Sequence, residues 1–283
     1  MNKLAIIDAD GLLYHSERTS IEESIHVLDE KIQNIFDKTE CTHYTLFISN
    51  GKYFRHKIDS CYKISREKYR NKTKWTKVLK QYLISQWNAQ WMDNVEADDL
   101  VAYWKSKSIE YTENIQCALM GIFDPNPIKP FEDKIICSPD KDLLQSIPGK
   151  HFNYTYKLED KTDLNSIVKG WWIETNVNDA SFFTWEQAVC GDTADGVKCL
   201  FGKGKAWTDK NFAGKSLKEV QHLVFDEYMK EYGTEKGIFE FQKNYRLLHM
   251  LDCDEDFIRE VGQLPQFPII NKINREEIIN TEF

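Results

Sequence analysis

Three carboxylates stand within four residues in the stretch NVEADDLVAYW (residues 94–104), at the start of an apolar helical pattern. Glu96, Asp98 and Asp99 are followed by residues of the types that proteins bury, so we expect the acids to lie beside a core. Acids in the first turn of a helix are favoured by the helix dipole, and they cap N–H groups that lack a partner. A capped helix start therefore explains this stretch when it is taken alone, and a metal site requires acids from elsewhere in the chain.

Further acids follow predicted strands. Asp8 ends the apolar run KLAIID, and Asp140 and Asp142 follow the run KIICS. Asp192 and Asp195 are three residues apart, so they share a face of a helical turn. Ligands of open parallel sheets bind beyond the carboxyl ends of the strands, and we therefore expect these acids to converge at one edge. Carboxylate oxygens suit Mg²⁺ or Mn²⁺, and two such ions support phosphodiester hydrolysis.

Positive charge is concentrated in residues 52–80. This segment holds eleven Lys or Arg and two acids, a net charge of +9, which leaves −17 on the rest of a chain whose total is −8. Charges act over a Debye length of about 8–10 Å, so one basic segment on an acidic body suits a local phosphate-binding surface. A solvated helix face explains the lysines, but not the aromatic residues between them, such as Tyr62, Tyr69 and Trp75.

A glycine–lysine motif follows the Asp192 pair. Gly202, Lys203, Gly204 and Lys205 are consecutive, and Lys198 lies shortly before them. Glycine lets backbone N–H groups approach a phosphate closely, and a helix N-terminus favours an anion. The motif alone is weak evidence for phosphate binding, and its position after an acid pair strengthens it.

Apolar runs predict an α/β fold with a central, mostly parallel sheet flanked by helices, because strands and helices alternate. The predicted strands are 3–8, 43–49, 114–120, 134–138 and 151–156. The predicted helices are 20–36, about 74–90, one that starts in 94–104, 142–147, and a helical region from about 180 almost to the chain end. The prolines of 121–131 exclude regular structure there.

Composition predicts a reduced, cytoplasmic protein without a membrane span. Hydrophobic residues make up 41% of the chain and aromatic residues 13%, which supports a real core. We find no run of about 18 apolar residues, and Asp8 interrupts the apolar stretch that a signal peptide needs. The seven cysteines contain no CxxC pair, so we predict neither a zinc site nor a disulfide framework.

Five motifs in order make the chain resemble the 5′–3′ exonuclease and flap endonuclease family, particularly its phage members. The resemblance extends more distantly to the 5′ nuclease domain of bacterial DNA polymerase I, and it covers roughly residues 4–250. The motifs are IIDADG, then Phe54-Arg55 with Tyr62, Lys63 and Arg66, then VEADD, SPDKD, and GDTADG followed by GKG.

The resemblance implies a PIN-like or 5′-nuclease-like sheet, a helical arch at about 52–92, and a helix-three-turn-helix motif that grips duplex DNA. The α/β nuclease core would span 1–180, and the helix-three-turn-helix and C-terminal helical region would span 181–283. Together they would form one compact unit, and the family favours a monomer.

The resemblance also implies site residues. Two Mg²⁺ ions would be bound, with Mn²⁺ as a substitute. Asp8, Glu96, Asp98 and Asp99 would hold the first ion, and Asp142, Asp192 and Asp195 would hold the second, with the catalytic Asp140 near both. Catalytic arch residues would be Tyr62, which stacks on a base, and Lys63 and Arg66, which neutralise the scissile phosphate. Arg55 and Lys198 would bind DNA, and the hairpin 202–205 would hold a DNA phosphate through K⁺.

The implied function is a Mg²⁺-dependent 5′–3′ exonuclease or 5′ flap endonuclease that uses two metal ions. Its partners would be DNA with 5′ ends, flaps or RNA primers, and replication proteins, in the host bacterial cytoplasm if the chain is phage-encoded.

Departures from the family keep two alternatives open. Ser49 and Asn50 stand where many members carry an acid after the second strand, which is consistent with a catalytically impaired, structure-specific DNA-binding protein. A PIN-like ribonuclease is the other alternative, and the helix-three-turn-helix sequence argues against it. Gly196 replaces a common Asn, and Asp10 is either a turn residue or a water-mediated metal contact.

Two clusters are predicted to be structural. The stretch LDCDEDFIRE would be a capped, solvated helix start, and the Trp171-Trp172 pair would pack in a core or lobe. We find no histidine with a partner pattern that suggests catalysis.

Overall fold

The computed structural model describes residues 2–66, 74–107, 131, 133–159, 166–267 and 270–271. Within them the sheet has the order β5-β4-β3-β1-β2-β6. The strands are β1 (Lys3–Asp8), β2 (His43–Phe47), β3 (Asp133–Cys137), β4 (Gly149–Leu158), β5 (Ile167–Thr175) and β6 (Ile270–Asn271). The strand predicted over 114–120 and all of the loop 121–131 except its last residue lie outside the described residues.

The middle of the sheet is parallel. Strand β1 pairs in parallel with β2 and β3, and β3 pairs in parallel with β4, whereas the outer pairings to β5 and β6 are antiparallel. The prediction of an α/β fold with a mostly parallel sheet is confirmed. The register pairs Asp8 with Phe47 and Ile7 with Cys137, so β1, β2 and β3 end at one edge. Side chains that follow these strands are therefore brought together.

Eleven helices are described. They are α1 (Asp10–Ser16), α2 (Ile21–Thr39), α3 (Arg55–Ile58), α5 (Thr76–Trp87), α6 (Ala97–Ser106), α8 (Lys141–Ser146), α9 (Val177–Cys190), α10 (Lys205–Phe212), α11 (Leu217–Tyr232), α12 (Thr234–Leu248) and α13 (Asp254–Glu260). Helix α2 starts where Ser20 and Glu23 predict it, because the Ser20 hydroxyl accepts the N–H of Glu23 at 3.1 Å.

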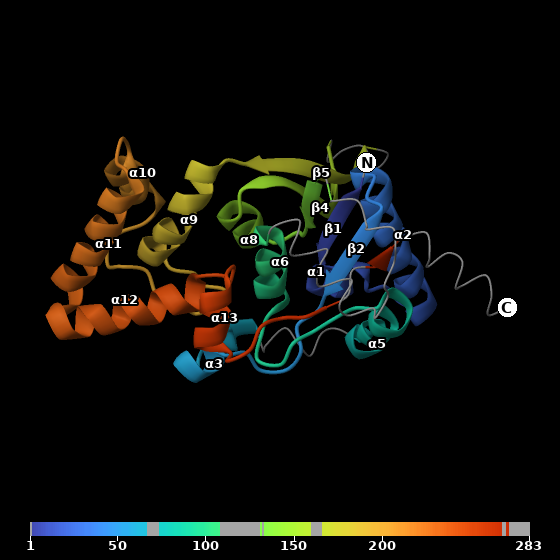
Figure 1. Cartoon of the computed structure of the whole chain (residues 1–283), viewed down its shortest axis with the longest axis horizontal. Helices are drawn as coiled ribbons and strands as arrows, with labels where there is room; N and C mark the ends of the chain where they lie inside the picture. The colour runs from blue at the N-terminus through green and yellow to red at the C-terminus, as the bar shows by residue number, and fades with distance from the viewer. Residues whose placement is uncertain are drawn as a thin grey trace, which may run out of the picture.

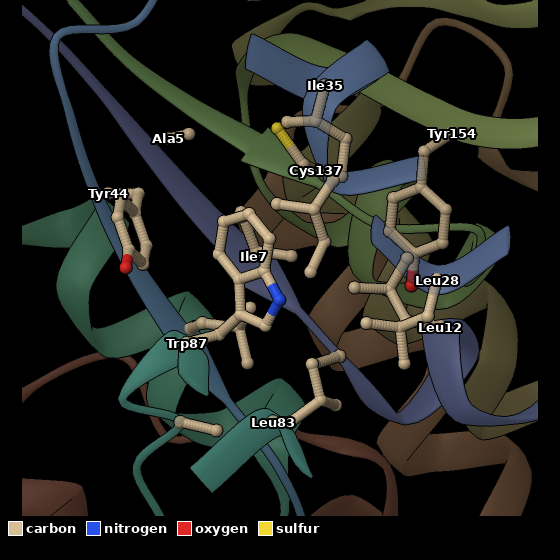
Figure 2. Close-up of a cluster of buried hydrophobic side chains, with 14 of the residues drawn as sticks. Ala5, Ile7, Leu12, Leu28, Ile35, Tyr44, Leu83, Trp87, Cys137 and Tyr154 are labelled. Atoms are coloured by element: carbon tan, nitrogen blue, oxygen red, sulfur yellow. The ribbon is translucent and has the colours of Figure 1, made fainter. Parts of the chain in front are cut away.

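Both faces of the sheet are covered. Alternate residues of β1 point to opposite faces, so Ala5 and Ile7 join one core cluster and Leu4 and Ile6 join the other. The first cluster packs α1, α2 and α5 against the sheet (Figure 2), and the second packs α6, α8 and α13 on the other face. This double covering explains why β1 is buried throughout almost its whole length.

Helices α9 to α12 form a helical lobe beside the sheet, at the left of Figure 1. The lobe has its own core cluster, which includes Val189 of α9 and Val220, Val224 and Tyr228 of α11. None of the helices in the described part of the chain has the length and apolarity that crossing a bilayer requires.

Strand β5 and helix α1 were not predicted. Strand β5 lies at the edge of the sheet and alternates exposed with half-buried residues, so it lacks a continuous apolar run. Trp172 is 46% exposed and its ring packs on Phe152 of β4 at 5.5 Å between centroids. The predicted packing role of this tryptophan is therefore a cross-strand contact, not a place in a lobe.

Candidate active site

Acids from four parts of the chain meet at the carboxyl edge of the sheet. Two adjoining cavities both include Glu96, Asp98 and Asp140 in their walls. The larger, of about 810 Å³, also includes Asp8 and Asp10. The smaller, of about 30 Å³, includes Asp142, Asp192 and Asp195. Seven of the eight predicted metal-ligating acids are thus brought together.

Local structure fixes the acids of the sheet. The Ser138 hydroxyl donates to Asp8 Oδ2 at 2.7 Å and accepts the N–H of Asp140 at 3.0 Å, which joins the ends of β1 and β3. Asp140 is the N-cap of α8, because its Oδ1 accepts the N–H of Asp142 at 2.8 Å. Ser138 was quoted only as part of the SPDKD motif, and its role depends on a contact with β1.

Lys63, Arg66 and Tyr62 line both cavities, as their predicted roles require. The Lys63 ammonium forms an ion pair with Glu96 and lies 3.6 Å from Asp195 Oδ2, and Arg66 forms an ion pair with Asp195. These cations therefore face acids of both the α6 start and the helical lobe.

Tyr62 is buried beside the acids of the site. The residue is 4% exposed and packs in a cluster with Tyr53, Val197 and Leu247, so its ring is largely covered by protein. Its predicted stacking on a base stays a prediction. Its hydroxyl donates to Glu96 Oε2 at 2.9 Å and to an oxygen of Asp195 at 3.0 Å. Tyr62 holds the acids of the site by their oxygens.

Arg55 and Asp99 form a buried ion pair beside the two cavities. Asp99 is fully buried and lines neither cavity, and its two oxygens accept from the Arg55 guanidinium at 2.6 and 2.8 Å. Arg55 is 3% exposed. Arg55 therefore neutralises Asp99 within the protein. The metal-ligating role of Asp99 and the DNA-binding role of Arg55 stay predictions, and neither follows from this geometry.

Comparison with known proteins gives a match in structure. No family model and no curated protein matches the sequence. A solved structure of T5 5′-exonuclease with bound zinc superposes with a TM-score of 0.53 at 21% identity, covering 93% of this chain and 94% of that one. A complex of the bacteriophage T5 flap endonuclease with DNA and metal ions gives a TM-score of 0.55 at 17% identity, covering 99% and 98%. The chain has the 5′-nuclease fold.

The two solved structures hold zinc and metal ions, and the residues at the corresponding edge of this chain are of types that fit divalent cations. The donors that line the two cavities are carboxylate oxygens, which hard cations prefer. Asp142 Oδ1 is buried and accepts no hydrogen bond from an N–H or hydroxyl of the described residues, its carboxyl group lies beside that of Asp192, and Lys141 Nζ is 3.8 Å away. An acceptor of this kind is where a metal ion belongs.

The electrostatics of this acid-rich site favour added cations. Burial raises the pKa of Asp8 to about 7, with a contribution from the charge of Asp10. Burial and the neighbouring Asp140 raise the pKa of Asp142 to about 7, and burial and Asp8 raise that of Asp98 well above its usual range. Glu96 is the exception. Burial opposes its ionisation, but the charges of Lys63 and Arg55 lower its pKa to about 2.

These shifts predict how Mg²⁺ stabilises the fold at different pH. A folded-state pKa of about 7 for Asp8 and Asp142 lies above the ordinary 3.8, so below about pH 7 both groups are mostly protonated in the metal-free fold. Their contribution to stability therefore falls as pH rises from about 4 to 7. A metal ion must displace those protons. We therefore expect the increase in Tm produced by Mg²⁺, relative to EDTA, to grow from about pH 5 to about pH 8.

The Asp142→Asn variant provides the control for this prediction, because it removes one of the two titrating carboxyls. It should weaken the pH dependence of the Mg²⁺-induced shift in Tm. A shift that is the same at both pH values in the unaltered protein would contradict the assignment of these acids as metal ligands.

The hairpin of the 5′-nuclease fold lies between α9 and α10. A Cβ added at Gly202 or Gly204 meets no atom within 4 Å, so the backbone there is open to a ligand. Lys198 is exposed, whereas Lys203 pairs with Glu227 at 3.2 Å and Lys205 pairs with Glu186 and, at 3.0 Å, with Asp209. The predicted hairpin residues therefore lie together, and two lysines of the hairpin, Lys203 and Lys205, form ion pairs with acids of the helical lobe.

Ser49 lies where many family members were expected to carry an acid. Its hydroxyl accepts the N–H of Ala97 at 2.9 Å, which fixes the start of α6, and its N–H donates to Asp10 Oδ1 at 3.0 Å. Asn50 accepts from Lys80 at 3.0 Å. Ser49 thus positions the α6 acids through the backbone, and Asp10 places a carboxylate in the cavity wall beside Asp8.

The acids of LDCDEDFIRE are less solvated than predicted. Asp256 is 8% exposed, forms an ion pair with Arg259, and lies 2.9 Å from His249 Nε2. The ligand atoms of His249, Asp252 and Asp256 lie within 4.8 Å of one another, as a metal site would require. The hydrogen bond to His249 lowers the pKa of Asp256, and Arg259 already neutralises its charge, so these contacts explain the cluster without an ion.

Proposed function

We propose that the protein is a divalent-metal-dependent 5′ nuclease that hydrolyses DNA phosphodiesters. One observation carries the proposal. Acids from β1, α6, α8 and the segment after α9 meet at one sheet edge, and Lys63 and Arg66 stand in the walls of the same two cavities. An acid-rich site with adjacent cations suits a phosphate bridged to the acids by metal ions.

We propose Mg²⁺ as the resident ion, with Mn²⁺ as a substitute. Asp8, Glu96 and Asp98 would hold one ion, and Asp142, Asp192 and Asp195 would hold the second, with Asp140 between them. When bound, the ions supply an activated water and stabilise the charge on the displaced oxygen. We leave Asp99 out of this proposed set because both of its oxygens accept hydrogen bonds from Arg55.

Lys63 and Arg66 bind and orient the phosphate in this proposal. Both line the two cavities, so their charged groups reach a phosphate that lies between the two groups of acids. Fixed positive charges stabilise the charge that develops on a transferring phosphoryl group. Tyr62 keeps Glu96 and Asp195 in place by donating its hydrogen bond between them.

We further propose that the helical lobe grips duplex DNA through the helix-three-turn-helix hairpin 202–205, with K⁺ between its backbone and a phosphate. The cavity of about 810 Å³ beside Asp8 would receive the frayed 5′ end, under the basic arch of about 52–92. The α/β core would be 1–180 and the DNA-gripping region 181–283. The protein would act as a monomer, and its substrates would be 5′ ends, flaps or RNA primers. It would work with replication proteins, in a host bacterial cytoplasm if it is phage-encoded.

The test uses one duplex DNA with a 5′ flap, labelled separately at its 5′ and 3′ ends. The protein is incubated with it at low salt in Mg²⁺, in Mn²⁺ and in EDTA, and the products are sized. We expect mononucleotides or short flap fragments from the 5′ end in either metal and none in EDTA. The product lengths distinguish exonuclease from flap endonuclease activity, and an RNA-containing flap measures the preference for RNA.

The same assay separates the second candidate function. Ser49 and Asn50 bond to Ala97 and Lys80 and supply no carboxylate at their position, which favours a protein that binds flap DNA without cutting it. Tight binding of the flap duplex with intact products in Mg²⁺ and Mn²⁺ would overturn the nuclease proposal and support that candidate. Cleavage of single-stranded RNA alone, without duplex binding, would instead support a PIN-like ribonuclease.

A further inference from the structure

We propose that the buried Arg55–Asp99 pair positions the metal-binding acids. It fixes the distance between the acids of the helical lobe and those at the edge of the sheet. This inference rests on the proposed function, because it concerns the same metal-binding acids. It assigns to Arg55 and Asp99 a role in the reaction without contact with metal or DNA.

Every N–H of the Arg55 guanidinium has an acceptor. Two bonds, at 2.6 and 2.8 Å, go to Asp99, and a third, from Nη1, goes to Glu96 Oε2 at 3.0 Å. The other two bonds go to the carbonyls of Leu247 at 3.0 Å and His249 at 2.7 Å, at the end of α12. A guanidinium has five N–H donors in a fixed plane, so each donor of this side chain makes a hydrogen bond.

Asp99 completes the link from the opposite side. Its Oδ1 also accepts the N–H of Leu251 at 3.0 Å, which lies just beyond α12. Its Oδ2 lies 3.4 Å from the N–H of Glu96. Both members of the pair therefore bind the chain segment at the end of α12. Arg55 binds carbonyls of this segment, and Asp99, in the first turn of α6, binds one of its N–H groups.

The link matters because the site is divided between two parts of the molecule. Glu96 and Asp98 belong to α6 on the sheet, whereas Asp192 and Asp195 follow α9 in the helical lobe. Leu247, whose carbonyl Arg55 binds, packs with Tyr62 and Val197 in one small cluster beside both sets of acids. The separation between the two groups of ligands thus depends on how the end of α12 is held against α6.

Geometry, more than stability, accounts for an ion pair at this position. Arg55 is 3% exposed and Asp99 is fully buried, and a buried ion pair can often be replaced by apolar residues without loss of stability. A lysine at position 55 would keep the charge but lose the planar fork that contacts α6 and α12 together. The pair therefore supplies a fixed geometry that an apolar or lysine replacement does not.

The experiment compares Arg55→Lys, Asp99→Asn and the apolar double variant R55M/D99L with the unaltered protein. Mn²⁺ binding to the DNA-free protein is measured by calorimetry, and flap-DNA affinity is measured in EDTA. We expect Mn²⁺ affinity to fall about 10–100-fold, as for partners that orient metal ligands, while DNA affinity in EDTA is unchanged. The Mg²⁺ concentration for half-maximal cleavage should rise in parallel.

Two control variants separate positioning from stability. Ile136→Val removes one methyl from the core of β3 and lowers stability without touching the pair. Arg246→Gln removes a bidentate ion pair from α12 to Glu260, at 3.0 and 2.7 Å, that contacts none of the site acids. Both should keep the Mn²⁺ affinity of the unaltered protein. R55M/D99L keeps the test valid if a single variant leaves an unpaired buried charge and fails to fold.

The outcomes are distinguishable from failure of the proposed function. Unchanged Mn²⁺ affinity in folded variants, or an equal loss in the Ile136→Val control, would overturn the inference whether or not the protein cleaves DNA. Selective loss of Mn²⁺ binding would support it even if the unaltered protein proves not to cut. A protein that binds no Mn²⁺ in its unaltered form would overturn both proposals.

Discussion

Replacing Lys63 with alanine is expected to lower the rate of 5′ cleavage about 10²–10³-fold and to leave duplex affinity unchanged. The ammonium of Lys63 lines both cavities, pairs with Glu96, and lies 3.6 Å from Asp195, so it is aimed at the place between the two groups of acids. Contacts that stabilise charge only in the transition state act on turnover, whereas duplex binding depends on other surfaces. Single-turnover rates with saturating enzyme and DNA binding in EDTA measure the two effects separately.

The Lys63→Ala experiment must exclude two other effects, a change in backbone strain and a general loss of positive charge. Lys63 has a φ of +55°, a conformation that costs alanine about as much as lysine, so Lys63→Ala adds no new backbone strain. Lys57 is an exposed lysine of the same basic segment that lines neither cavity, and Lys57→Ala should leave turnover unchanged. An equal loss of turnover and duplex affinity in Lys63→Ala would show that Lys63 acts by general attraction of DNA and has no role in the chemical step.

Asp140→Asn is expected to abolish metal-dependent cleavage while the protein still binds flap DNA. Asp140 lies in the walls of both cavities, beside the acids that are proposed to hold the ions. Asparagine is as good an N-cap as aspartate, so the start of α8 is preserved, but it lacks the negative charge with which a carboxylate would help to hold a divalent cation. The loss should exceed the about 10–100-fold effect of residues that only orient a ligand. Product sizing in Mg²⁺ and binding in EDTA provide the two readouts.

Asp179→Asn is the matched control for this change. Asp179 is an exposed aspartate in the first turn of α9, outside both cavities, so its replacement should alter neither cleavage nor binding. Cleavage by Asp140→Asn at the rate of the unaltered protein would exclude Asp140 as a ligand. Loss of DNA binding together with cleavage would point to misfolding of the α8 start, which Tm would reveal.

Local signals predicted much of this fold. The run KLAIID predicts β1 with both of its ends, because a buried central strand needs a continuous apolar sequence. Ser20 and Glu23 predict the start of α2 because a capping box depends on residues three apart. Strand β5 was missed because an edge strand with exposed residues and Gly170 has no such run. An element is thus predictable when the residues that determine it are neighbours in the sequence, as for β1 and the start of α2, and it is missed when they are not, as for β5.

The sequence by itself determined that carboxylates follow β1 and β3 and open α6, and that parallel strands bring such ends to one edge. Only the tertiary structure decided which carboxylates remain available to a ligand. Asp98 and Asp99 are neighbours in the same helical turn, yet Asp98 lines the cavities and Asp99 is bound by Arg55, which is 44 positions earlier. Likewise, tyrosine is a residue type that can stack on a base, but Tyr62 is packed against Leu247 of α12. A motif gives residue types and spacing, whereas the neutralisation of a buried charge depends on a partner that folding brings from a distant segment.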